Sequence, residues 1–176
     1  VTVNDLVVNG SLSSVARGIA IDTSQRLDAT FLQATAGDLI IRSNSALNVT
    51  SGSATGNIQL SGSDFSASSL DAGGNLTGNF TGNVLADFAR SGGNLSLGAG
   101  SGGISASILD AVGTLDLNGT GDVAATFVNA GGDVSVQGSN VSLFNIADGV
   151  TIADATATQG NVQLFGEGSF TLRNAT

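Results

Sequence analysis

The side chains that could carry chemistry in this chain are almost all carboxylates. Its 176 residues include 14 Asp and Glu and five Arg, but no His, Cys or Lys. The absence of His and Cys removes the commonest transition-metal ligands, the commonest general base near neutral pH and all thiol chemistry. What remains is carboxylate chemistry, namely acid–base attack on a polysaccharide or coordination of calcium, which takes oxygen ligands.

Carboxylates must converge to act together, and a repeat in the chain decides where they lie. Gly recurs at a nearly constant interval, at Gly18, Gly37, Gly56, Gly74, Gly93, Gly113 and Gly132. After most of them comes Asp or Asn and then two alternating apolar residues, as in Gly37-Asp38-Leu39-x-Ile41. The phrase returns after a longer gap, at Gly160-Asn161-Val162-x-Leu164. We interpret this gap as one coil plus an insertion of about nine residues within 138–159.

Measured from the Gly that opens each repeat, the carboxylates share no common position. The offset is 8 for Asp64, 9 for Asp122, 13 for Asp87, 15 for Asp71, 17 for Asp110 and 3 for Asp116. Asp38 and Asp133 share an offset but lie five repeats apart. A repeat-protein enzyme needs several converging carboxylates. We therefore expect no catalytic site, no defined metal site and no cofactor. The Gly-Gly-x-Gly-x-Asp signature of calcium-binding β-rolls is absent, which leaves only weak surface binding of calcium open.

Three short strands with period-2 alternation fit into each repeat. The first strand is formed by the alternating apolar residues that follow each repeat Gly. An apolar signal in the last third of each repeat predicts an internal core stack of Phe31, Leu70, Phe88, Ile108, Phe127 and Ile146. A further apolar set lies between these two and includes Leu47, Phe65, Val84, Ile104 and Val123. The polar residue after Gly predicts a corner ladder of hydrogen bonds between stacked repeats, formed by Asp38, Asn57, Asn75, Asn94, Asp133 and Asn161.

One such repeat cannot fold alone, because its apolar surface is too small to offset the loss of backbone entropy. If each repeat makes one coil, every strand pairs in parallel with its equivalent one repeat away, about 4.8 Å along the axis. We therefore predict an all-β fold, a right-handed parallel β-helix (β-solenoid) of about 19 residues per coil and roughly nine coils. It forms a single domain over 1–176, with regular coils over 18–137, an irregular coil or insertion over 138–159, and ends without polar caps. A β-sandwich would have no reason to repeat one phrase at a fixed interval.

The charge of the chain excludes one class of partner. The formal net charge is −9, whereas nucleic-acid binding depends on neutralising phosphates with Lys and Arg. The five Arg are dispersed and form no basic patch. No apolar run approaches the length of about 18 residues that a membrane helix needs, so we expect no membrane span.

The repeats Gly73-Gly74-Asn75-Leu76 and Gly92-Gly93-Asn94-Leu95 resemble those of filamentous-haemagglutinin-type exoproteins. This family comprises large bacterial two-partner-secretion adhesins and contact-dependent toxins with β-helical shafts. The resemblance covers about residues 18–137 well and 138–176 loosely. It implies export, display at the extracellular cell surface, and a role in adhesion or in holding another module away from the cell. The secretion module of such exoproteins, a toxin and a receptor-binding tip are not recognisable here.

These expectations favour a structural and adhesive shaft, either a spacer or a segment of a self-assembling filament. Its partners would be a receptor or glycan on a host or neighbouring cell, and further copies of itself end to end. The chain does not begin with Met, which is typical of an excised or processed segment. The alternative is a polysaccharide-active solenoid enzyme or a glycan-binding, tail-fibre-like module. Aromatic side chains on the outer surface, on which sugar rings could pack, would support this alternative. Trp and Tyr are absent, however, and most Phe are predicted to face inward.

Overall fold

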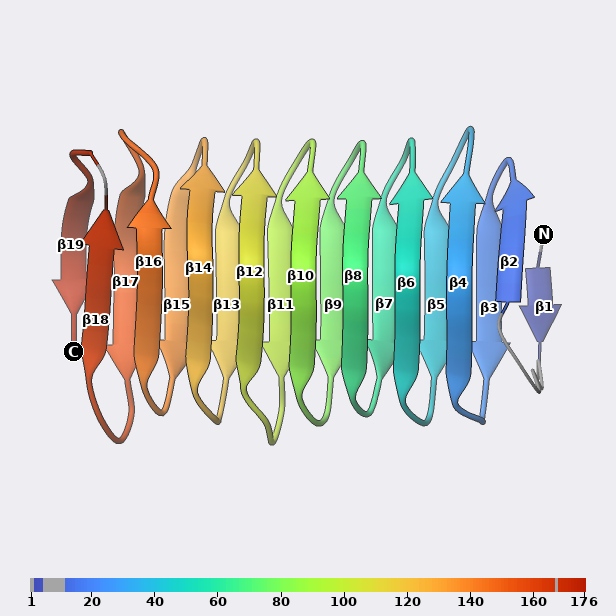
Figure 1. Ribbon diagram of the computed structural model, residues 1–176, viewed down its shortest axis with the longest axis horizontal. Helices are drawn as coiled ribbons and strands as arrows, with labels where there is room; N and C mark the ends of the chain where they lie inside the picture. The colour runs from blue at the N-terminus through green and yellow to red at the C-terminus, as the bar shows by residue number, and fades with distance from the viewer. Residues whose placement is uncertain (1, 5–11, 167) are drawn as a thin grey trace.

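The chain winds into a flattened helix of parallel β-strands that form two facing sheets (Figure 1). The computed structural model describes residues 2–4, 12–166 and 168–176. The ten-stranded sheet is ordered β1 (Thr2–Asn4), β3 (Ile19–Thr23), β5 (Leu39–Ser43), β7 (Ile58–Gly62), β9 (Leu76–Phe80), β11 (Leu95–Ala99), β13 (Leu115–Gly119), β15 (Asp133–Gly138), β17 (Thr151–Ala157) and β19 (Thr171–Ala175). The nine-stranded sheet is ordered β18 (Val162–Gly166), β16 (Val141–Ile146), β14 (Val123–Ala130), β12 (Ile104–Ala111), β10 (Val84–Ser91), β8 (Phe65–Ala72), β6 (Leu47–Ala54), β4 (Leu27–Ala34) and β2 (Leu12–Ala16).

Equivalent residues of successive repeats lie side by side, as the repeat predicts. Leu76 pairs with Leu95 and Leu95 with Leu115, and every strand pair in both sheets is parallel. The chain rises along the nine-stranded sheet, crosses over and descends along the ten-stranded sheet while it advances from β2 to β19, which makes the helix right-handed (Figure 1). The predicted fold class, a right-handed parallel β-solenoid in which each repeat makes one turn, is confirmed.

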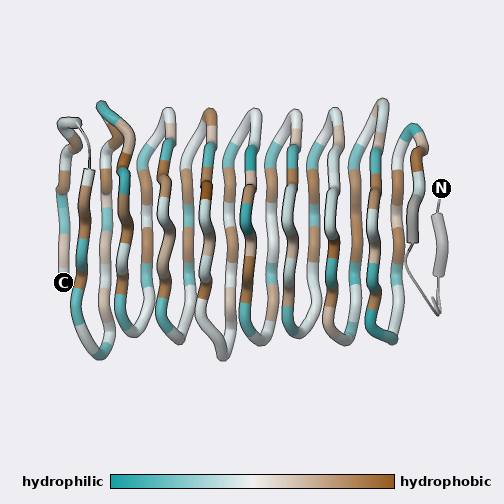
Figure 2. Tube along the Cα trace, viewed as in Figure 1, coloured by the Kyte–Doolittle hydropathy of each residue, from teal (hydrophilic) through white to brown (hydrophobic). Residues whose placement is uncertain are grey.

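Each turn contains two strands, and the prediction of three was wrong. The phrase after Gly forms the short strand of the ten-stranded sheet, for example Leu95–Ala99. The other two predicted strands are one continuous strand of eight residues, for example Val84–Ser91. Figure 2 shows how apolar and polar residues alternate along both kinds of strand.

The eight-residue strand does not alternate strictly, and this overturns part of the predicted core stack. Its first, third, sixth and eighth residues are buried, while the fourth and fifth both face outward, as in β8 and β14. Of the predicted stack, Leu70 and Ile146 are fully buried. The other members occupy the fifth position or its equivalent and lie on the outside, namely Phe31, Phe88, Ile108 and Phe127. The residues that do stack in the core here are their neighbours, Leu32, Ala89, Leu109 and Val128.

The core is one continuous cluster of side chains between the two sheets, and both sheets contribute to it. The intermediate apolar set predicted from sequence, Leu47, Phe65, Val84, Ile104 and Val123, is buried throughout. Phe65 from β8 stacks on Phe80 from β9 across the interior, with ring centroids 4.5 Å apart and planes inclined by 9°. Gly78 makes room for this pair, because a Cβ there would lie 2.8 Å from the Phe80 ring and 2.9 Å from Leu97. The large rings are therefore accommodated by a small residue on the same strand.

The corner ladder exists over four of its six predicted members. The backbone N–H of Asn57 donates to Asp38 Oδ1, that of Asn75 to Asn57 Oδ1, and that of Asn94 to Asn75 Oδ1, at 2.7 to 2.9 Å. Thr114 continues the series by donating to Asn94 Oδ1 but has no carboxamide with which to extend it. Each rung therefore joins one turn to the next through a side-chain oxygen.

Asp133 and Asn161 do not belong to this ladder. Asp133 accepts a hydrogen bond from Arg173 Nη1 at 3.0 Å. Asn161 lies at the opposite corner, where its N–H donates to Asn140 Oδ1 and Asn140 Nδ2 donates to Asp122 Oδ1. A second set of corner hydrogen bonds thus precedes the nine-stranded sheet.

The longer gap before Asn161 corresponds to one and a half turns. The phrase at Gly132 leads into β15 of the ten-stranded sheet, whereas the phrase at Gly160 leads into β18 of the nine-stranded sheet. Residues 138–159 contain β16 and β17, which pair with the preceding turn. Local irregularities occur here, including a register shift opposite Val134 and positive φ angles at Asn145 and Gly149. The additional length is half a turn and not an inserted loop.

Candidate functional site

Three outward rows of side chains run across β10, β12 and β14 on the outer face of the nine-stranded sheet, and one of them also includes a residue of β8. The middle one, which we call the apolar row, consists of Phe88, Ile108 and Phe127, which are paired directly in register. Ile108 is 37% exposed and Phe127 38% exposed, whereas Phe88 is half-buried. Parallel pairing places these side chains about 4.8 Å apart along the axis. The molecule therefore presents a continuous apolar line to solvent over three turns.

The row on one side of this line consists of the carboxylate of Asp87 and the hydroxyl groups of Ser107 and Thr126. We call it the hydroxyl row. These residues precede the three apolar ones in the chain, and all are exposed. Within the described part of the chain their side chains make no hydrogen bond or ion pair. Their oxygens are therefore available to an incoming ligand.

The row on the other side, which we call the paired row, consists of Asp71, Arg90, Asp110 and Asn129. Arg90 lies in register with Asp71 and with Asp110. Arg90 Nε lies 3.5 Å from Asp110 Oδ2, and Asn129 Nδ2 donates to Asp110 Oδ1 at 2.8 Å. These contacts hold the Asp110 carboxylate in place between a guanidinium and an amide.

Asp71 and Asp110 lie in one column two turns apart, with Arg90 between them, and this alignment was not predicted from the sequence. Their offsets from Gly differ, because the corners between the strands vary in length while the strands themselves stay in register. Counting from the first residue of the long strand would have aligned them, since each is the seventh residue of its own strand, β8 or β12.

The apolar surface continues beyond β14. Phe144 of β16 and Phe165 of β18 stack with centroids 5.1 Å apart and planes inclined by 3°, at 39% and 54% exposure. Between Phe127 and the corner at Asp148 lies an open hollow of about 750 Å³, which is also lined by Asn145 and Ser169. Phe side chains therefore face outward on each of β10, β14, β16 and β18.

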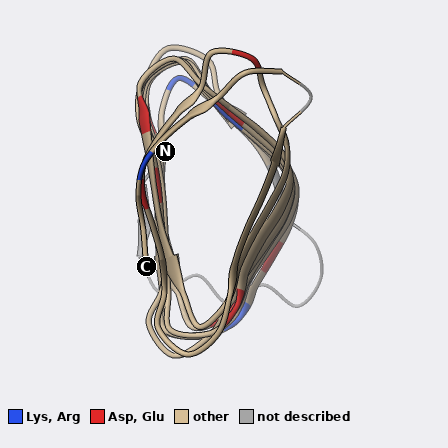
Figure 3. Ribbon diagram, turned by 90° about the vertical axis from the view of Figure 1, so that its left-hand side faces the viewer, with Lys and Arg blue, Asp and Glu red and all other residues tan. Residues whose placement is uncertain are grey.

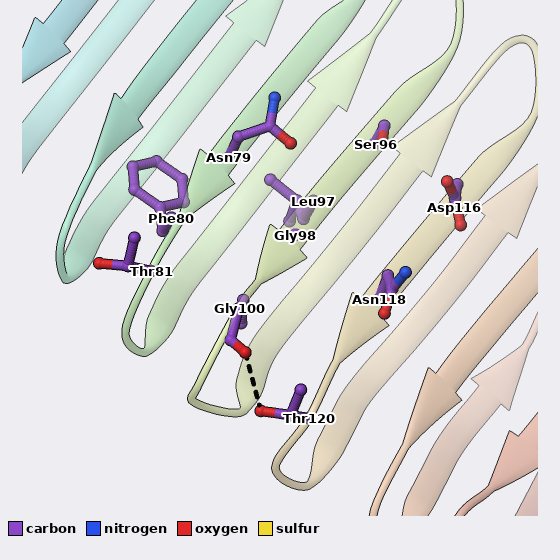
Figure 4. A pocket seen from close by; sticks show the side chains of 11 residues that line it. Asn79, Phe80, Thr81, Ser96, Leu97, Gly98, Gly100, Asp116, Asn118 and Thr120 are labelled. Atoms are coloured by element: carbon purple, nitrogen blue, oxygen red, sulfur yellow. Dashed lines mark hydrogen bonds between the residues drawn. The ribbon is translucent and has the colours of Figure 1, made fainter.

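The opposite outer face has a different character. A shallow hollow of about 400 Å³ lies over β9, β11 and β13, where Gly98 carries no side chain; Figure 4 shows the residues that line it. Asn79 and Asn118 flank Gly98 on the neighbouring strands, and Ser96 and Asp116 lie further along. The lining of this hollow contains a single carboxylate, so it lacks the carboxyl pair that glycoside hydrolysis requires.

Charged residues occur at several places around the outline of the helix (Figure 3). Among the described residues no group of three or more Asp, Glu, His or Cys is placed to hold a metal ion. Asp64 and Asp122 lie at the corners that precede β8 and β14, and their oxygens accept hydrogen bonds from Asn83 and Asn140. No helix in the described part of the chain could cross a membrane.

Comparison of the chain with protein-family models, with curated proteins and with solved structures found no match.

Proposed function

We propose that this chain is an extracellular structural and adhesive shaft of a bacterial surface protein. The observation that carries the proposal is the unbroken parallel pairing of one turn with the next, from β1 to β19, around a single core. A protein built in this way is quasi-one-dimensional, because each turn contacts only its neighbours. Its length increases by about 4.8 Å with every added turn. Such a fold spans distance and presents extended outer faces.

The composition supports an exposed location. A net charge of −9 keeps a β-rich rod in solution by mutual repulsion. The absence of Cys makes the stability of the rod independent of the redox state of its surroundings. On this proposal the shaft acts outside the cell, without catalysis and without a cofactor, and its partners are a receptor or glycan on another cell or further copies of the chain joined end to end.

Labelling of intact cells of the source organism tests the location. An antibody raised against residues 12–166 should bind unpermeabilised cells, and deletion of this segment from the full-length protein should reduce attachment to neighbouring or host cells. A variant in which an unrelated rod of equal length replaces the segment distinguishes adhesion from spacing. Attachment should be restored in this variant only if the segment acts as a spacer. Labelling that appears only after cell lysis would overturn the proposal.

Among the alternatives, the structure favours glycan binding over catalysis. Phe88, Phe127 and Phe165 face outward, and aromatic rings on the outside are the feature that a glycan-binding module needs. Asp71 and Asp110 lie on either side of Arg90 in register. Charged groups of both signs in one line can hold the hydroxyl groups of a sugar through charge-assisted hydrogen bonds.

A further inference from the structure

We propose that the outer face of the nine-stranded sheet binds an extended, neutral polysaccharide that lies along the solenoid axis. The ligand would cover the apolar row, with the hydroxyl row and the paired row on either side. The inference rests on the adhesive function proposed above and names its ligand. Its physical basis is an alternation of apolar and hydrogen-bonding side chains in narrow parallel lines.

A sugar ring has the matching pattern. Its C–H groups form apolar faces, which pack on Phe88, Ile108 and Phe127, while its hydroxyl groups project from the edges. The edge toward the hydroxyl row meets side-chain oxygens that have no partner in the described structure. Hydrogen bonds to charged groups are stronger than neutral ones. The carboxylate of Asp87 and the guanidinium of Arg90 would therefore contribute most to the binding of the sugar hydroxyl groups. Because the rows repeat at every turn, a polymer can repeat the same contacts along its length.

The exposed apolar side chains of this face suit a narrow ligand. Leu85, Ile108, Phe127, Phe144 and Phe165 together present roughly 400 Å² to solvent. A patch of this size is within the range that marks functional sites on monomers. Along β10, β12 and β14 the apolar row is one side chain wide between two polar rows, which matches a narrow ligand better than a broad protein face.

The charge of the face selects among narrow ligands. Asp71, Asp87 and Asp110 contribute three negative charges and Arg90 one positive charge, which leaves a local net charge of −2. A second copy would bring this charge against itself. Anionic lipid surfaces, nucleic acids and acidic polysaccharides would be repelled for the same reason. A neutral polysaccharide carries no such penalty.

Affinity electrophoresis of the whole chain through gels that contain a neutral β-glucan, a mannan or a soluble cellulose derivative tests this inference. Gels with polygalacturonate serve as the acidic counterpart. At least one neutral polymer should retard the chain. Phe88→Thr combined with Phe127→Thr should weaken that retardation by about tenfold or more. Leu172→Thr is the matched control, since Leu172 is a 44% exposed apolar residue of β19 in the ten-stranded sheet, and it should bind like the parent.

Circular dichroism and the thermal midpoint of each variant establish that the fold is retained. The inference is overturned if the folded parent binds no neutral polymer, if the double variant binds as well as the parent, or if only the acidic polymer retards the chain. Sedimentation that shows a dimer abolished by the double variant would overturn it in favour of a second copy. Labelling of intact cells is an independent readout, so binding without surface labelling would reject the shaft's location and not its ligand.

Discussion

The two sheets share one core but present different outer faces. At its centre the ten-stranded sheet shows Thr77, Ser96 and Asp116 to solvent, whereas the nine-stranded sheet shows the apolar row and, further along, Phe144 and Phe165. Folding requires only that the inward rows match from turn to turn. The outward rows are free to differ. The apolar row is therefore not explained by the demands of the core, and this difference is what points to a ligand.

The largest expected effect is the difference in stability loss between removing an inner and removing an outer aromatic ring. Phe65→Ala removes a buried ring that stacks on Phe80, and it should lower the free energy of unfolding by about 3–5 kcal/mol. Phe127→Ala removes a ring that is 38% exposed, and it should cost less than about 1 kcal/mol. Chemical denaturation of both variants measures the two values. Equal losses would mean that Phe127 lies in the core.

The corners and the outer faces should differ in their tolerance of a side chain. A Cβ at Gly102 would lie 2.6 Å from the backbone carbonyl carbon of Gly82 in the turn below. Gly102→Ala should therefore destabilise by about 1–3 kcal/mol, because backbone cannot move aside easily. A Cβ at Gly98 would meet the Asn79 side chain first, at 3.3 Å, so Gly98→Ala should be neutral or slightly stabilising. The difference in thermal midpoint between the two alanine variants checks this, and a reversed order would contradict it.

An Asn of the corner ladder should contribute more to the free energy of unfolding than an Asn on an outer face. Asn75→Ala removes the oxygen that accepts the N–H of Asn94 at 2.8 Å, and it should cost about 1 kcal/mol. Asn79→Ala is the control, since within the described chain the Asn79 side chain makes no hydrogen bond. Urea midpoints for the two variants measure the effect. Indistinguishable midpoints would show that the ladder does not stabilise the stack.

The smallest expected effect is a loss of stability at acidic pH. The hydrogen bond that Asn48 Nδ2 donates to Asp28, together with Arg26, holds the pKa of Asp28 below its usual value of 3.8. A depressed pKa in the folded state adds stability above pH 3.8, and this contribution is lost as the pH falls below that value through the folded pKa. Because the carboxylate is 45% exposed, the contribution should be below about 0.5 kcal/mol. Asp28→Asn should therefore lower stability slightly at about pH 6 and not at about pH 2.5, which urea denaturation at the two pH values measures.

The fold could be predicted from the sequence because the repeated phrase places like residues at equal intervals. Leu76, Leu95 and Leu115 alternate with polar residues and follow the same corner, so parallel stacking is the arrangement that buries all of them. The intermediate apolar set was predictable for the same reason. In both cases strict period-2 alternation holds from the start of the strand.

The outward row could not be predicted from alternation, because the fourth and fifth residues of the long strand both face out. The signal was nevertheless present. If repeats are aligned on the first residue of the long strand, the fifth column contains Ser51 and Ser69 as well as Phe88, and a column that accepts Ser is not a core column. The sixth column is buried and contains Leu32, Leu70, Leu109 and Val128. Aligning on Gly mixed the two columns, since the corner before the strand varies in length.

The orientation of adjacent residues in β12 tests the account most directly. The chain has no Cys, so Ile108→Cys and Leu109→Cys each introduce a single thiol. Ile108 is 37% exposed and Leu109 is fully buried. The thiol at position 108 should react with a maleimide almost as fast in the native protein as in denaturant, whereas the thiol at position 109 should be protected until the protein unfolds. The opposite order of reactivity would contradict the account.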